Sequence, residues 1–203
     1  LVVLVALMNA VNFLDNMNGV IAGLSAIILA AFGCLSASRG NYGLGAAQLA
    51  LSGACLGFLR YNFPRARIFL GDAGSLFLGY SIGASALLAF DGAPPGWGRM
   101  GALFMLAYPA FDLLFVVVNR LREGRKVYEG GKDHSNHRLA SVIRCQTRTV
   151  ILLWLVGAVL CASGLAVLKL NRPLPTLVLS VLWILLFLWA GMRLSSVPVN
   201  RPP

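Results

Sequence analysis

Charged residues are scarce in this sequence. Only 12% of its 203 residues are Asp, Glu, Lys or Arg, whereas 58% are hydrophobic, and the mean hydropathy is +0.78. A soluble domain of this length needs more polar surface than that to cover its core. The composition therefore excludes an ordinary soluble domain.

Patterns typical of metal sites, disulfides and signal peptides are also missing. The four cysteines show no CxxC or Cys/His spacing, and three of them lie in apolar segments, where a thiol behaves as a small hydrophobe. We expect neither a zinc site nor a disulfide. The chain begins at Leu1 in an apolar run, without a basic segment or a small-residue cleavage site. We expect the sequence to be the C-terminal part of a longer protein.

Long apolar runs dominate what is present. A helix needs about 20 residues to cross the hydrocarbon core of a membrane, and several runs approach that length. The first run is shorter and is expected to be the end of a truncated helix. The pattern predicts an all-α, polytopic transmembrane helix bundle of about six full spans, forming a single membrane domain over residues 1–203. The apolar segments are 1–12, 19–38, 44–60, 74–90, 100–118, 149–169 and 174–192.

The basic residues lie in the connections between these runs. The formal net charge is +10, which in a soluble protein would suggest nucleic acid. If the runs cross the membrane alternately, 13 of the 17 Lys and Arg residues fall on one side, which the positive-inside bias places in the cytoplasm. We therefore expect a lipid bilayer as partner, and no nucleic acid. The polar loops 9–19, 60–75 and 119–148 fall on that same side, which indicates one composite site.

Polar side chains recur every third residue at the end of the first apolar segment, at Asn9, Asn12, Asp15 and Asn18. On a continuous helix each step drifts by about 60°, so Asn9 and Asn18 would nearly oppose each other. They converge only if the helix ends near Asp15, which Gly19 permits. A capped helix end is the alternative. Four polar side chains exceed what a cap needs, and burying them in a membrane is costly, which favours a functional site.

A second motif joins arginines to an aspartate flanked by glycines. Arg65 and Arg67 precede Asp72, which lies between Gly71 and Gly74 at the start of an apolar segment. Glycines allow close approach of a ligand, a helix N-terminus favours phosphate, and an Asp there can hold a divalent cation. An N-cap aspartate after a tight turn is the alternative, and the nearby arginines favour the phosphate interpretation.

Both histidines of the chain, His134 and His137, lie in one basic loop with Lys132 and Arg138. A helical pair at this spacing can bind metal, but without Cys and with one nearby Asp the pattern does not favour zinc. Imidazoles beside Lys and Arg suit a pyrophosphate better. The alternative is a solvated loop that touches anionic lipid headgroups.

Asp112 lies inside the apolar segment 100–118. An acidic residue there is expensive and marks a functional or paired site. We expect an arginine near the cytoplasmic helix end to be its partner.

Taken in order, these motifs resemble the polyprenyl-phosphate N-acetylhexosamine-1-phosphate transferase superfamily (glycosyltransferase family 4). It includes the enzyme that makes undecaprenyl-pyrophosphate-GlcNAc and the phospho-N-acetylmuramoyl-pentapeptide translocase. Residues 9–19 are similar to the family's NxxNxxDGxDGL, and residues 69–75 to its FMGDxGS. Asp112, the basic residues 120–126 and the stretch 134–139 resemble its late D…R…GR…HxHHRL pattern. The resemblance covers essentially the whole chain.

The resemblance implies a magnesium-dependent enzyme, with Mn²⁺ as an alternative ion. Such an enzyme moves N-acetylhexosamine-1-phosphate from a UDP-sugar to a polyprenyl (undecaprenyl) phosphate and releases UMP, in bacterial cell-envelope polysaccharide biosynthesis. It implies a multi-pass protein of the bacterial inner membrane with its active site on the cytoplasmic face, and a homodimer as a candidate assembly. In this pattern Asn62 and Phe69 contact the uracil. Catalytic roles fall to Asp72 (also the metal ligand), Asp15, His134 and His137, and substrate binding to Asn9, Asn12, Asn18, Asn62, Phe69 and Arg138, the last with the histidines on the pyrophosphate.

The sequence departs from the family pattern at three points. Asn16 and Asn18 replace a Gly and an Asp of the first motif, and Asn136 stands where the family often has His. An adjacent Asp-Asp pair, which the family carries on an earlier helix, occurs nowhere in this chain. We therefore expect residues 1–203 alone to be inactive.

Two other classes compete with this interpretation. A transporter would place Asn and Asp along a path near mid-membrane and would show repeats, whereas these clusters gather on one face. A catalytically dead relative that still binds nucleotide-sugar is compatible with Asn18 and Asn136, because both replace ionisable groups.

Overall fold

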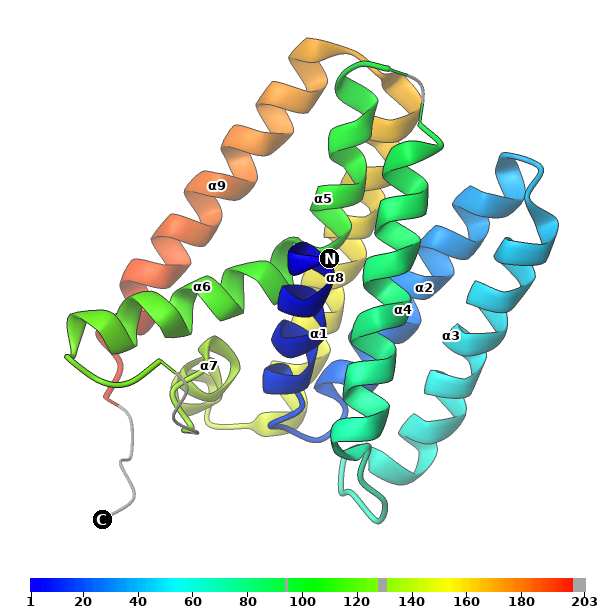
Figure 1. The fold of residues 1–203 in the computed structure, drawn as a ribbon. Coiled ribbons are helices and arrows are strands. Elements are labelled where there is room, and N and C mark those ends of the chain that lie inside the picture. The colour runs from blue at the N-terminus through cyan, green and yellow to red at the C-terminus, as the bar shows by residue number, and fades with distance from the viewer. Residues whose placement is uncertain (94, 128–130, 199–203) are drawn as a thin grey trace.

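The computed structural model describes residues 1–93, 95–127 and 131–198, and within these ranges the chain forms helices joined by turns (Figure 1). The helices are α1 (Val2–Leu14), α2 (Val20–Ser38), α3 (Tyr42–Asn62), α4 (Gly71–Asp91), the short 3-10 helix η1 (Trp97–Met100), α5 (Gly101–Met105), α6 (Ala107–Arg122), α7 (Ser135–Ile143), α8 (Gln146–Leu170) and α9 (Pro173–Ser195).

The predicted polytopic helical bundle is confirmed. In the described part of the chain, five helices are long and apolar enough to cross a membrane, namely α2, α3, α4, α8 and α9. The pair formed by residues 97–105 and 107–122 gives a sixth span if it is counted as one. Helix α1 has 13 residues, shorter than a crossing requires.

The predicted single segment 100–118 is wrong in one respect, because the structure breaks it. The helix stops at Met105, and α6 starts at Ala107 with a bend of 66° between the two parts. Pro109 explains why the chain restarts a helix there: proline has no N–H to donate, so it fits the first turn of a helix, where that N–H has no partner. Helix α6 therefore runs across the bundle, away from the direction of α5 (Figure 1).

Helix α2 lies at the centre of the bundle. It packs against α3, α4 and α8, and 61% of its most apolar stretch is buried. Small residues permit the closest of these contacts: a Cβ added at Gly45 of α3 would lie 3.0 Å from the carbonyl oxygen of Gly33 in α2. Helix α9 differs, since only 6% of its apolar stretch is buried, and it splays from the bundle (Figure 1).

The connections that carry the polar motifs gather at one end of the bundle. The turn after α1, the turn after α3, helix α7 and the C-terminal end of α9 all lie there, at the bottom of Figure 1. The turn after α2 and the one after α8 lie at the opposite end. The fold therefore brings the loops 9–19, 60–75 and 119–148, as far as they are described, to one face.

Candidate active site

The first motif is formed by a helix that ends inside it. Helix α1 stops at Leu14, Asp15 follows as its C-cap, and the chain turns until α2 begins after Gly19. Gly19 has a φ of 81°, and a Cβ there would lie 2.7 Å from Cδ2 of Phe63, so both backbone conformation and space require glycine. The expectation that the helix ends near Asp15 is confirmed.

Asn12 joins the first motif to the second. Its Nδ2 donates to Oδ1 of Asp72 at 3.0 Å and to Oγ of Ser75 at 2.8 Å. Asp72 lies in the first turn of α4, and Ser75 lies one turn further on and is fully buried. Gly71 starts α4 with a φ of 65°, the left-handed conformation that glycine adopts without strain. One oxygen of the Asp72 carboxylate is thus fixed by Asn12.

Asp15 and Asp72 form a pair of neighbouring carboxylates. The pKa of Asp15 is raised to about 6, first because the carboxyl is partly buried and second because the negative charge of Asp72 repels its ionised form. Two negative carboxylates that lie close together repel each other, and a cation bound between them offsets that repulsion. Asp15 therefore titrates near neutrality in the absence of a cation.

Asn16 and Asn136 join the first motif to the third. Nδ2 of Asn136 donates to Oδ1 of Asn16 at 2.6 Å, across 120 residues of sequence. Asn136 is completely buried in the first turn of α7, and its own Oδ1 accepts from the backbone N–H of His137 at 2.7 Å. The three motifs are thereby connected through side-chain hydrogen bonds at the same end of the bundle.

Four of the predicted substrate-binding residues have distinct positions. Asn62 is 6% exposed; its Oδ1 accepts from Gly19 N at 2.7 Å, and its Nδ2 donates to Ile68 O at 2.9 Å. Phe69 is 76% exposed and free to stack on a planar ligand. Asn18 makes a long contact of 3.5 Å to Pro64 O, whereas Asn9 donates back to Val5 O at 2.8 Å within α1. Asn62 thus fixes the two turns against each other, and its predicted uracil contact stays a prediction.

The prediction that Asp112 pairs with an arginine is wrong. Asp112 is 1% exposed and binds the start of α7: Oδ2 lies 2.7 Å from Nδ1 of His134, and Oδ1 accepts from the backbone N–H of Ser135 at 2.8 Å and from its hydroxyl at 2.5 Å. Tyr108 OH lies 3.3 Å from the same hydroxyl. A carboxylate at Nδ1 holds the imidazole in one orientation and leaves Nε2 for other contacts.

The arginines pair instead with Asp133. Arg120, 4% exposed, donates from Nε at 2.8 Å and from NH2 at 2.7 Å to the two oxygens of Asp133, and Arg125 adds a contact of 3.0 Å. Burial alone would raise the pKa of Asp133, but the two arginines outweigh it and the pKa falls to about 2. This pairing holds the residue before His134 in place.

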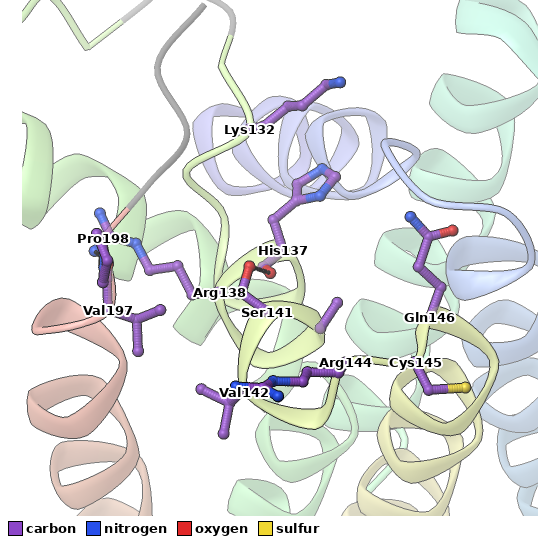
Figure 2. Close-up of a pocket in the computed structure, with 11 residues that line it drawn as sticks. Lys132, His137, Arg138, Ser141, Val142, Arg144, Cys145, Gln146, Val197 and Pro198 are labelled. Atoms are coloured by element: carbon purple, nitrogen blue, oxygen red, sulfur yellow. Dashed lines mark hydrogen bonds between the residues drawn. The ribbon is translucent and has the colours of Figure 1, made fainter.

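His137, Lys132 and Arg138 border a cavity of about 580 Å³ beside α7. Figure 2 shows His137 and Lys132 on one side of α7, and Arg138 extending sideways from the helix, toward Val197 and Pro198. The pKa of His137 is lowered because burial disfavours the charged imidazole and because His134 and Lys132 add repulsion. His137 is therefore expected to be neutral at physiological pH.

The residues present can hold a magnesium ion but do not enclose one. Among the described residues, no group of three His, Cys, Asp or Glu side chains gathers as a metal site. Mg²⁺ is commonly held by one or two carboxylates, with the remaining positions taken by water and substrate phosphates. The pair Asp15 and Asp72 fits that pattern, with the ion completed by a phosphate ligand.

Ser75, Asn16 and the Asp112–His134 pair belong to the site but were not predicted as such. Ser75 had a usable signal, because it lies three residues after Asp72 and shares its helix face. Asn16 had no such signal, because its partner Asn136 lies 120 residues away in the sequence. The pairing of Asp112 with His134 had none either, because the two residues are 22 apart.

Comparisons with known proteins find relatives along most of the chain. The model of "Glycosyl transferase family 4" matches residues 1–90. The chain is 33% identical over 162 residues to a probable undecaprenyl-phosphate N-acetylglucosaminyl 1-phosphate transferase of Bacillus subtilis, covering 80% of this chain and 45% of the relative. It is 35% identical over 163 residues to a phospho-N-acetylmuramoyl-pentapeptide-transferase of Moorella thermoacetica, covering 80% of this chain and 49% of the relative.

A third relative extends the match along the chain. The undecaprenyl-phosphate alpha-N-acetylglucosaminyl 1-phosphate transferase of Escherichia coli O157:H7 is 27% identical over 190 residues, which is 92% of this chain and 52% of the relative. The chain thus spans about half the length of the curated relatives it matches.

Proposed function

We propose that the chain belongs to glycosyl transferase family 4 and that its protein transfers a sugar-1-phosphate to a polyprenyl phosphate. The match of residues 1–90 to the family model and the relatives along most of the chain support this. The donor would be a UDP-sugar carrying an N-acetylhexosamine. The setting would be envelope polysaccharide synthesis at the cytoplasmic face of a bacterial inner membrane. The relatives named above carry polyprenyl phosphate or muramoyl-pentapeptide substrates in their names, which supports this class of reaction.

One observation carries the proposal: the fold joins three motifs that are far apart in the sequence. Asn12 binds Asp72, and Asn136 binds Asn16, so a carboxylate pair and a basic histidine loop share one end of the bundle. Acidic side chains that hold a cation, set near imidazole and ammonium groups, suit a ligand with several phosphate charges.

In the proposed reaction, an oxygen of the polyprenyl phosphate attacks the β-phosphorus of the UDP-sugar. A new P–O bond forms between the lipid phosphate and the β-phosphorus, the bond between the β-phosphorus and the bridging oxygen breaks, and UMP leaves with that oxygen. Mg²⁺ bound at Asp72 and Asp15 would neutralise charge on the diphosphate.

The other side chains would position the substrates. Lys132 and His137 point to the same side of α7 and would contact the diphosphate, and exposed Phe69 would stack on the uracil. Asp112 would hold His134 in one tautomer, with Nε2 directed away from the carboxylate.

A transfer assay in membranes that express the complete gene tests this function. Undecaprenyl phosphate is supplied with a panel of radiolabelled UDP-sugars, with and without Mg²⁺ or Mn²⁺. We expect cation-dependent formation of labelled lipid with one or a few of the sugars, and no product from residues 1–203 alone. Nucleotide-sugar binding without any product would instead identify a catalytically dead relative.

The binding of a divalent cation is expected to depend on pH through Asp15. Its raised pKa, about 6, means that the carboxyl is neutral below that pH and must lose a proton to bind a cation. Affinity should therefore rise with pH, by about tenfold per unit below pH 6, and level off above it. Titration of the full-length protein with Mn²⁺ followed by EPR between pH 5 and 8 measures this.

Asp15→Asn is the control for this titration. It removes the titrating group, so its Mn²⁺ binding should be weaker and nearly independent of pH in this window. Asp15 also affects the stability of the cation-free protein. Burial and the charge of Asp72 both disfavour the ionised carboxyl, so the free energy of unfolding should fall as pH rises through its folded-state pKa of about 6. A wild-type affinity that stays flat from pH 5 to 8 would contradict the assignment of Asp15.

A further inference from the structure

We infer that Arg138 is a positioning residue, which ties the histidine-bearing helix α7 to the C-terminal end of α9, so that α9 acts as a strut for the active site. The inference rests on the proposed function for its kinetic consequences. It reassigns Arg138, which the family pattern places on the pyrophosphate.

The hydrogen bonds of Arg138 go to backbone carbonyls at the end of α9. Its NH1 lies 3.3 Å from Leu194 O, 3.0 Å from Ser195 O and 3.0 Å from Val197 O, and the residue is 4% exposed. The last carbonyls of a helix have no partner within the helix and carry the negative end of its dipole. A guanidinium placed there satisfies them and is itself stabilised.

Helix α6 completes the same junction. The Arg138 guanidinium lies 5.4 Å from the ring centroid of Phe115, and Leu194 of α9 packs in a small buried cluster with Phe115 and Val116. Leu139, the neighbour of Arg138 in α7, packs against that cluster. Three helices that are separate in the sequence therefore meet around one buried arginine.

Helix α9 contacts the rest of the bundle at a few places along its length, and this junction is one of them. Only 6% of its apolar stretch is buried, and the helix diverges from the bundle between its two ends (Figure 1). Midway along it, Phe187 stacks on Phe111 of α6 with ring centroids 4.6 Å apart. Nε1 of Trp183 donates to Oγ of Ser163 in α8 at 3.2 Å, and the C-terminal end of α9 accepts from Arg138. The position of that end therefore depends on Arg138, and the position of α7 depends in turn on the end of α9.

The position of α7 matters because its first turn carries the site. His134 caps it, and Asn136 and His137 follow immediately. Asp112 fixes the beginning of α7 through His134 and Ser135, and Arg138 fixes the helix about one turn later. Together with the hydrogen bond from Asn136 to Asn16, these attachments restrict rotation and tilt of the helix. Displacements near 1 Å at a catalytic group cost on the order of 100-fold in rate.

Arg138 borders the cavity beside His137 and Lys132, but most of its hydrogen bonds go to backbone carbonyls. Its side chain extends sideways from α7 toward Val197 and Pro198, in a different direction from His137 (Figure 2), and its Nη1 is already shared among three carbonyls. Its NH2 lies 3.8 Å from Oε1 of Glu123. Nε donates to Asp133 O at 3.2 Å.

A double-mutant cycle in the full-length protein tests the strut. One change is Arg138→Met, which keeps the bulk and removes the donors. The other is truncation after Met192, which removes all three acceptor carbonyls and leaves residues 173–192, still about long enough to cross a membrane. Truncation after Pro198 is the matched control, because it keeps Leu194, Ser195 and Val197. Arg138→Lys keeps the charge and part of the hydrogen bonding.

Kinetics and hydrogen exchange are both measured. We expect Arg138→Met and the Met192 truncation each to lower kcat by about 10- to 100-fold, with KM for the UDP-sugar and for the lipid nearly unchanged. The double variant should be no worse than the poorer single variant, Arg138→Lys should be intermediate, and the Pro198 truncation should match wild type. Amides of residues 135–143 should exchange faster in the impaired variants.

A direct role on the substrate would give a different result. KM for the UDP-sugar would then rise by about tenfold or more in Arg138→Met, the Met192 truncation would leave kcat intact, and the effects would multiply in the double variant; any of these overturns the strut. If Arg138→Met does not accumulate, Arg138→Lys replaces it in the cycle with the same criteria. If wild type transfers no sugar, the proposed function fails, and unchanged exchange in α7 would then overturn the strut independently.

Discussion

Asp72→Asn is expected to lower the rate of sugar-phosphate transfer by about 1,000-fold or more. The substitution keeps the size and the hydrogen-bonding reach of the side chain, so Asn12 can still contact it. It removes the negative charge that a divalent cation needs in the first turn of α4, beside Asp15. Because α4 begins there with Gly71 and no other carboxylate lies in that first turn, no neighbour can replace it.

Asp91→Asn is the matched control for this result. Asp91 is the last residue of the same helix and lies at the opposite end of the bundle, exposed to solvent. The control should transfer sugar-phosphate at the wild-type rate and accumulate to the same level. If Asp72→Asn kept more than about a tenth of the activity, the assignment of Asp72 as cation ligand would be wrong.

Asp112→Asn is expected to reduce kcat by about 100-fold while leaving KM for both substrates nearly unchanged. Asp112 accepts three hydrogen bonds from His134 and Ser135 in a setting where it is 1% exposed. An amide offers only one acceptor oxygen and adds two N–H donors, so it can serve Ser135 or His134 but not both. The imidazole then turns or changes its tautomer, and the orientation of Nε2 is lost.

Ser135→Ala separates this effect from a general loss of packing. It removes the hydroxyl that Asp112 accepts from but keeps the backbone N–H of residue 135 and leaves His134 untouched. Activity should fall by less than about tenfold. The pH–rate profile should shift in Asp112→Asn alone, because only that variant changes the charge beside the imidazole. Equal losses in the two variants, with unchanged pH profiles, would reduce Asp112 to a packing role.

The membrane spans and the polar end of the bundle could be predicted because their cause is local. A run of apolar residues is a helix in lipid whatever surrounds it, since every backbone group must be satisfied within the segment. The ending of α1 near Asp15 was likewise predictable, because Gly19 and the spacing of Asn12, Asp15 and Asn18 have a consequence within one turn of helix. The spans and the end of α1 are both determined by residues that are close together in the sequence.

The partners of the charged residues could not be predicted in the same way. Asp112 was expected to bind an arginine, yet His134 takes that place and Asp133 takes Arg120. The sequence does not decide between the two pairings, because Asp112 and Arg120 both lie on α6 while Asp133 and His134 are neighbours in the stretch before α7. The bend between Met105 and Ala107 decides between them, since it sets where α6 points as it approaches that loop. Arg138 depends in addition on the end of α9, which lies 56 residues away.

The bend has a consequence for the lipids around the protein. Helix α6 has 16 residues and turns 66° from the helix before it, which itself runs beside α4 and α8 (Figure 1). Of its length of about 24 Å, only about 10 Å lies along that direction. Leu114, Val118 and Leu121 of α6 are exposed along this shallow course. We therefore expect a bilayer of ordinary thickness to meet a short apolar wall there, so that hydrophobic mismatch thins the bilayer beside the active-site end.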